Sequence, residues 1–239
     1  YLGLVRDAAG TVSANFEGRL ADAFACFAPV GTGGCGFPMP LEAMSRALDP
    51  TFTENGDFLR DGAALLVVIV TDKDDCSAPP DTDLFDPFQT DPTSVLGPLS
   101  TYRCFEFGET CGDLPPGRAA GLRSGCTPGE PDPRYTLTPI PTYAAALNAS
   151  HDGRVVLGVI AGPVAGPPAA VDVVVDADQF PRLVPACYSG GEGADPAIRL
   201  AALTADLLQT NSASICRDYS QSLLDWADQA MVAGRSCGE

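Results

Sequence analysis

The 239-residue chain has little histidine, little basic charge and no long apolar run. His151 is the only histidine, and no Gly-x-Ser-x-Gly motif accompanies it, so the sequence gives little support to a hydrolase. The 14 Lys plus Arg face 31 Asp plus Glu, a formal net charge of −17 that argues against nucleic acid or an anionic membrane as the partner. No apolar stretch approaches the roughly 20 residues of a transmembrane helix, so no direct membrane span is expected.

Cysteine, by contrast, is abundant, with nine residues scattered along the chain and no CxxC pair of the kind that binds zinc. Disulfides formed in an oxidising compartment explain them better than several unpaired buried thiols, so we expect an extracytoplasmic protein that is periplasmic, on the cell surface or secreted. The pairs that we favour, among on the order of 100 arrangements of eight cysteines, are Cys26 with Cys35, Cys76 with Cys104, Cys111 with Cys126 and Cys187 with Cys216. Cys237 is left over and could pair outside the chain.

The strongest local signal is the apolar run at residues 63–70, which ends in the polar sequence TDKDDC. A short Val- and Ile-rich run of this kind is typical of a strand buried on both faces of a parallel sheet. Ligand-binding groups collect beyond the carboxyl ends of such strands. We therefore expect Thr71, Asp72, Asp74 and Asp75 to mark a binding region.

Helical and strand patterns alternate along most of the chain. They predict, in order, a strand over Tyr1–Val5, helices over Glu17–Val30 and Pro40–Leu48, the buried strand, a helix over Thr142–Ala149, strands at Arg154–Ala161 and Val171–Val175, a helix after Asp195-Pro196, a strand at Ser212–Cys216 and a last helix after Asp218. Residues 73–139 lack periodicity and read as a cysteine-rich insertion. This order predicts an α/β fold with a doubly wound, mostly parallel sheet and helices on both faces.

Three segments resemble von Willebrand factor type A domains. LLVVIVTDKDDC is similar to the fourth strand of that family, GTGGCGFPMPLEAM to its Gly-Thr loop and following helix, and SASICRDYSQSLLDWA to its closing strand and last helix. More narrowly, the motifs resemble secreted or lipid-anchored bacterial members from myxobacteria. The resemblance implies one Rossmann-like domain over residues 1–239. The residues that resemble its first strand, with the family's Asp-x-Ser-x-Ser motif, are absent here. Either an upstream segment or a second chain completes the sheet and pairs with Cys237, or the metal site is degenerate.

The same resemblance implies a divalent-cation site that an acidic residue of the ligand completes. Thr32 would supply a hydroxyl and Asp72 a carboxylate, with Asp74 as a further ligand, and such oxygen donors suit Mg²⁺ or Mn²⁺. Ca²⁺ is less favoured because the acidic residues lack EF-hand spacing. The acidic run could instead be a solvated loop.

These observations favour a non-enzymatic extracytoplasmic binding or adhesion module, dependent on a divalent cation if the partial site is occupied. Its partner would be a protein or a cell surface. The alternative is a structural subunit of a cell-surface or extracellular assembly in which the metal site is vestigial.

Overall fold

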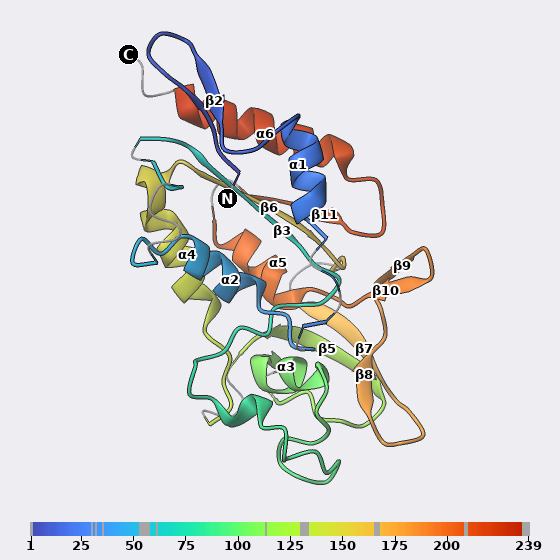
Figure 1. Ribbon diagram of the computed structural model, residues 1–239. Coiled ribbons are helices and arrows are strands. Elements are labelled where there is room, and N and C mark those ends of the chain that lie inside the picture. Colours follow the sequence, from blue (N-terminus) through green and yellow to red (C-terminus); the bar gives the residue numbers. More distant parts are fainter. Residues whose placement is uncertain are drawn as a thin grey trace. The chain divides into compact units, whose positions relative to one another are not determined.

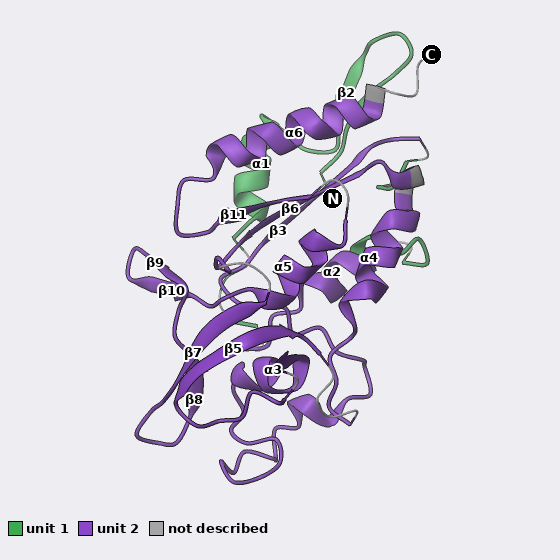
Figure 2. Ribbon diagram, turned by 180° about the vertical axis from the view of Figure 1, so that it is seen from behind, with its two compact units in different colours: residues 1–35, 47–60 green, residues 36–46, 61–239 purple. Residues whose placement is uncertain are grey.

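The computed structural model describes residues 2–29, 31, 33–34, 36–52, 58–60, 62–112, 114–129, 134–164, 168–207 and 210–235. Two compact units divide the chain (Figure 2). Unit 1 contains residues 1–35 and 47–60, and unit 2 contains residues 36–46 and 61–239. Within the described residues no helix is long and apolar enough to cross a bilayer.

Unit 1 consists of a small hairpin and one helix. Strands β1 (Leu4–Arg6) and β2 (Val12–Ala14) pair in antiparallel fashion. The carboxylate of Asp7 closes their turn by accepting hydrogen bonds from the backbone of Ala9 and Thr11. Helix α1 (Leu20–Phe27) forms where the helical periodicity predicts it.

A three-stranded parallel sheet forms one part of unit 2. Its strands are β11 (Thr210–Ser214), β6 (Val155–Ala161) and β3 (Leu65–Val70), in that order. The sixteen-residue helix α6 (Ser220–Arg235) covers one face, where Trp226 packs against Val156 and Ile160. Gly158 makes this contact possible, because a Cβ atom there would lie 2.2 Å from the indole ring.

Three further helices lie on the other side of this sheet (Figure 1). They are α2 (Pro40–Ala47), α4 (Ile140–Ala149) and α5 (Ile198–Ala205). A 3₁₀ turn, η3 (Ser150–Gly153), follows α4. Pro40 begins α2 as the sequence predicts, since its missing N–H costs nothing in the first turn of a helix.

The second part of unit 2 is antiparallel. Strands β4 (Glu109–Cys111), β5 (Gly121–Pro128), β7 (Ala169–Val175) and β8 (Pro181–Leu183) form a sheet in that order, and β9 (Cys187–Ser189) pairs with β10 (Glu192–Ala194) in a hairpin. Helix α3 (Tyr102–Gly108) contributes Tyr102 and Phe105 to a buried apolar cluster that also contains Val171 and Val173 of this sheet. A 3₁₀ turn, η2 (Asp83–Phe85), precedes α3.

The prediction of a doubly wound, mostly parallel sheet is therefore wrong. Only three of the described strands are parallel, and the remaining sheets are antiparallel. The error has two sources. Residues 73–139, which lack periodicity, contain α3, β4 and β5, and β7 alternates between buried and exposed positions, as a strand with one covered face does.

Candidate functional site

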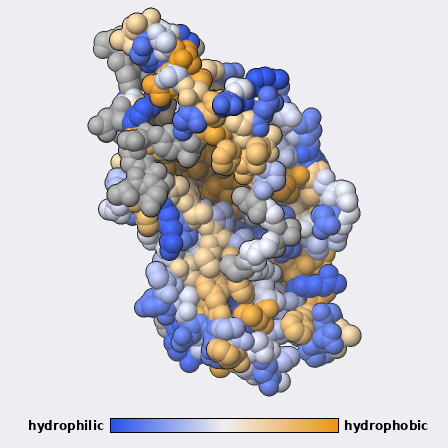
Figure 3. Space-filling model, viewed as in Figure 1, coloured by the Kyte–Doolittle hydropathy of each residue, from blue (hydrophilic) through white to orange (hydrophobic). Residues whose placement is uncertain are grey.

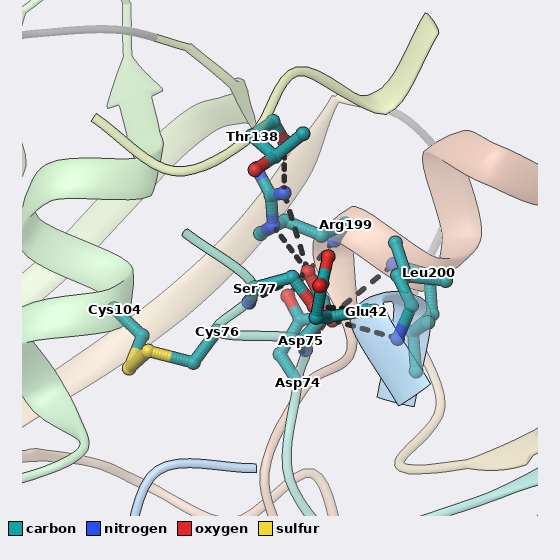
Figure 4. Close-up of polar contacts among 10 residues, drawn as sticks. Glu42, Asp74, Asp75, Cys76, Ser77, Cys104, Thr138, Arg199 and Leu200 are labelled. Carbon is teal, nitrogen blue, oxygen red and sulfur yellow. Dashed lines mark hydrogen bonds and ion pairs between the residues drawn. A yellow bond between two sulfur atoms is a disulfide. The ribbon is translucent and has the colours of Figure 1, made fainter. Parts of the chain in front are cut away.

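The polar residues that follow β3 form a buried hub. Asp75 is completely buried, and its carboxylate accepts hydrogen bonds from the backbone N–H of Leu41 at 3.1 Å and from the hydroxyl of Ser77 at 2.6 Å. The same carboxylate lies 3.2 Å from Nε of Arg199, which is 2% exposed. The Ser77 hydroxyl in turn accepts from the backbone N–H of Glu42 at 2.9 Å. Asp75 and Ser77 thus satisfy the free N–H groups at the start of α2 (Figure 4).

Asp74 plays the same part for α5. Its two oxygens accept from the backbone N–H groups of Arg199 at 2.8 Å and Leu200 at 3.2 Å, and a third bond comes from the N–H of Asp75 (Figure 4). Although the residue is partly exposed, its carboxyl points inward, and loss of hydration raises its pKa to about 6 against the opposing effect of these bonds. The loop after β3 therefore caps two helices from outside.

The structure describes two of the three predicted cation ligands, Asp72 and Asp74. Thr32 lies outside the described residues. Asp72 is exposed, and its backbone oxygen accepts a 2.9 Å bond from the N–H of Asp195. Asp74 uses both oxygens on α5. No group of three or more Asp, Glu, Cys or His side chains among those described is arranged to hold a metal ion.

A cavity of about 30 Å³ adjoins the hub. Among the described residues that line it, Glu109 alone has buried side-chain oxygens without a hydrogen-bond partner. The charged residues that line the cavity are Lys73, Asp74, Asp75, Glu109, Asp195 and Arg199. Glu109 begins β4 and is 1% exposed, and neither carboxyl oxygen has a hydrogen-bond partner. No sequence signal identifies Glu109, because nothing local to a short strand in an irregular region indicates that its side chain is buried.

An irregular segment that we name the Phe88 loop, residues 84–98, is held by one buried arginine. Arg103 of α3 is 1% exposed, and its guanidinium donates to five backbone oxygens, those of Leu84, Asp86, Gln89, Gly97 and Pro98. Burial lowers the pKa of this guanidinium, and nearby Arg118 adds to the effect. Leu84 and Leu96 anchor the two ends of the loop in the core, where both are fully buried.

A second arginine braces the outer part of this loop. The guanidinium of Arg118 donates to the backbone oxygens of Pro92, Ser94 and Val95 and forms a 2.8 Å ion pair with Glu106. Within the loop, the carboxylates of Asp86 and Asp91 accept from backbone N–H groups two residues further on. At its tip the side chain of Phe88 is 92% exposed. The backbone of the loop is thus held by many hydrogen bonds, whereas the large apolar side chain of Phe88 faces solvent.

Three disulfides join the partners expected from the sequence: Cys76 with Cys104, Cys111 with Cys126, and Cys187 with Cys216. The first bond connects the Asp75 hub to α3 at Cys104 (Figure 4). Cys26, expected to pair with Cys35, is an exposed free thiol. Cys35 and Cys237 lie outside the described residues. The three bonds favour an oxidising, extracytoplasmic environment.

The chain matches no protein-family model, no curated protein and no solved structure. The resemblance to type A domains accordingly stays a prediction, and the site has to be interpreted from its own chemistry.

Proposed function

We propose that this protein is an extracytoplasmic, non-enzymatic binding module that recognises a protein or cell-surface partner through the Phe88 loop. The observation that carries the proposal is the contrast between the fixed backbone of this loop and the 92% exposure of Phe88 at its tip. Binding residues commonly lie on loops that a rigid scaffold positions.

The order of the loop comes at an energetic cost. Fixing each backbone residue costs roughly 1–2 kcal/mol of conformational entropy. Burying the charge of Arg103 costs more, since no carboxylate among the described residues is hydrogen-bonded to its guanidinium and backbone oxygens replace its hydration. A loop whose only task is to connect two elements does not need such bracing. A recognition loop does, because a surface ordered in advance loses less entropy when it binds.

Phe88 has the chemistry of an interface anchor. Aromatic residues are enriched at the centres of protein interfaces, where one ring fills a pocket of the partner. On the face seen in Figure 3, hydrophobic residues are interspersed with hydrophilic ones over the part of unit 2 that contains α3. A mixed surface of this kind suits a non-obligate complex better than a permanent one.

The charge around the loop indicates the kind of partner. Asp81, Asp83 and Asp91 are exposed, and residues 77–101 contain no Lys or Arg. Backbone and side-chain hydrogen bonds from Phe88 and Gln89 lower the pKa of Asp86, so this group stays charged at neutral pH. A partner surface with an apolar pocket and a basic rim would complement both features.

A cation-dependent mode of binding would rest on Thr32 and Asp72 with Mg²⁺ or Mn²⁺. Titrating either metal into the protein while following thermal unfolding tests it, since a ligand that binds only the folded state raises the melting temperature. Stabilisation that disappears in Asp72→Ala supports this mode, and an unchanged melting temperature speaks against it.

Site-specific photocrosslinking tests the main proposal. The photoreactive residue benzoylphenylalanine replaces Phe88 in one protein and Tyr188 in a control, because Tyr188 is also exposed, at 64%, on the β9–β10 hairpin. The proteins are displayed on cells that normally carry this protein and are then irradiated. We expect a discrete crosslinked adduct from position 88 and none from position 188. High salt during irradiation should lower the yield of this adduct, because salt screens the charges that bring the partner to the loop. Equal adducts from both positions, or none from position 88, would contradict the proposal.

A second candidate function, as a subunit of an assembly, is favoured by the free edge of β3. The N–H of Leu65 donates to Arg154, just before β6, and that of Thr71 donates to Ile160 of β6. The N–H groups of Leu66, Val68 and Val70 therefore point away from β6. No described strand pairs with that edge, and the side chain of Val70 is 56% exposed. Apolar edges of this kind readily accept a further strand.

Sedimentation of the purified protein distinguishes the two functions. An assembly subunit should form oligomers that Val70→Lys disperses, because a charge on a sheet edge opposes strand pairing. If the wild type and Val70→Lys both sediment as monomers, the result favours the binding module.

A further inference from the structure

The side chain of Glu109 is buried in an environment that does not suit a charge. Among the carboxylates that the structure describes, only that of Glu109 has both oxygens buried and without a hydrogen-bond partner. An ionised carboxylate in such a place loses its hydration and gains nothing in return. A protonated carboxyl group carries no such penalty.

The charges that face Glu109 do not compensate it. Those that line the same cavity are Lys73, Asp74, Asp75, Asp195 and Arg199. Arg199 already donates to Asp75 and to the backbone oxygen of Thr138, and Lys73 is paired with Asp195 at 3.1 Å. The remaining neighbours on α3, Cys104 and Phe105, are apolar.

A proton explains this arrangement better than a metal ion does. The oxygens of Asp74 and Asp75 are occupied by backbone N–H groups, Ser77 and Arg199, so they are not free to join Glu109 around a cation. The cavity, at about 30 Å³, has room for a water molecule beside a protonated carboxyl group.

We propose that Glu109 holds a proton in the folded protein, and that this proton makes the packing of α3 and β4 against the Asp75 hub sensitive to pH. The proposal concerns the stability of unit 2 and does not depend on the function of the Phe88 loop. Burial raises the pKa of Glu109 well above its ordinary value, with the negative charge of Asp74 as the next contribution.

The direction of the effect follows from proton linkage. Between the pKa of an unfolded Glu, about 4.3, and the higher pKa of the folded state, the folded protein binds more protons than the unfolded chain. Stability that is present below this window is therefore lost as the pH rises. For one proton the ratio of folded to unfolded protein falls about tenfold per pH unit.

Urea unfolding of the wild type and of Glu109→Gln at pH 5, 6, 7 and 8 tests the proposal. Glutamine is a neutral group of the same shape, so the difference between the two proteins reports the titration of Glu109 together with its coupling to Asp74. We expect the variant to gain about tenfold in its folding equilibrium constant, relative to the wild type, for each pH unit within the window. Glu192→Gln on the exposed strand β10 is the matched control and should show no such gain. A difference between Glu109→Gln and the wild type that stays constant from pH 5 to pH 8 would overturn the proposal.

Carbon-13 NMR of glutamate-labelled protein provides a second readout that needs no variant to fold. One Glu carboxyl signal should keep the chemical shift of the protonated group well above pH 5. This signal should disappear in Glu109→Gln and in Glu109→Met, which assigns it to Glu109. If every Glu signal titrates near its ordinary pKa, Glu109 is ionised and the proposal is wrong. A cation in the cavity would be a different outcome. If millimolar Mg²⁺ or Ca²⁺ at pH 8 stabilised the wild type but neither variant, the cavity would bind a cation, and the proposal of a protonated Glu109 would be wrong.

Discussion

Two buried arginines stabilise two regions of unit 2 in different ways. Arg199 is paired with Asp75 in a hub that joins α2, α5 and the loop after β3. Arg103 is hydrogen-bonded to backbone oxygens alone, and these belong to an irregular loop. The first arrangement compensates a charge and orients regular elements. The second uses a charge to give an irregular backbone one conformation, which is why we assign recognition to that loop.

The comparison predicts its largest effect at Asp75. Asp75→Asn leaves the Arg199 guanidinium buried without its counter-charge, which should reduce the free energy of unfolding by about 3–5 kcal/mol. Urea unfolding of the variant measures this loss. Asp72→Asn, at an exposed neighbouring position, is the control and should change stability little.

The double variant Asp75→Asn with Arg199→Met sharpens this test. An apolar side chain removes the uncompensated charge, so the double variant should be more stable than Asp75→Asn alone. Losses that simply add would show that the ion pair is not the reason for the effect.

A smaller loss is expected when the arginine of the loop is removed. Arg103→Met leaves up to five backbone oxygens without their donor, and we expect a loss of about 2–4 kcal/mol, because some of these oxygens can turn to water. The melting temperature measures the loss. Limited proteolysis should then cut within residues 84–98. A variant that resists proteolysis as well as the wild type does would contradict the role of Arg103.

Asp74 predicts a second dependence of stability on pH, separate from that of Glu109. Its pKa of about 6 lies above the unfolded value, so the folded state binds the extra proton and stability decreases as the pH rises toward 6. The slope should be about 1 kcal/mol per pH unit for this group. Unfolding of Asp74→Asn across pH 4–6 should show a flatter profile than the wild type. An equal slope in both proteins would show that Asp74 does not titrate in this range.

The smallest expected effect on stability is that of Phe88→Ala. A side chain that is 92% exposed contributes almost nothing to the core, so the melting temperature should not change. Binding to partner-bearing cells should nevertheless fall at least about tenfold, as the loss of an interface anchor does. Tyr188→Ala is the control, and equal binding by both variants would remove Phe88 from the recognition surface.

The sequence predicted those features that depend on local patterns. The apolar runs at β3 and β6, the proline start of α2 and the last helix are all visible as short-range periodicity. Asp195-Pro196 indicated the start of α5, but the helix begins at Ile198, and the carboxylate of Asp195 is paired with Lys73 instead. The N–H groups at the start of α5 instead donate to the carboxylate of Asp74, which lies more than a hundred residues away in the sequence.

The site was largely invisible in the sequence for the same reason. Arg103, Glu109 and Arg199 owe their roles to burial by segments distant in sequence, and no local motif marks a buried charge. The acidic run after β3 predicts metal ligands or a solvated loop, and no local pattern in it indicates that Asp74 and Asp75 accept hydrogen bonds from the N–H groups at the start of two helices. The antiparallel strand β5 was missed because glycines and a proline within it mask the alternation of its side chains.

Amide hydrogen exchange over residues 84–98 of the free protein tests the central claim most directly. The account predicts slow exchange at the bonded N–H groups of Phe88, Thr93 and Gly97, with protection that collapses in Arg103→Met while β3 and β6 stay protected. Exchange at the rate of an unstructured peptide in the wild type would contradict it, because the loop would then have no conformation of its own to present.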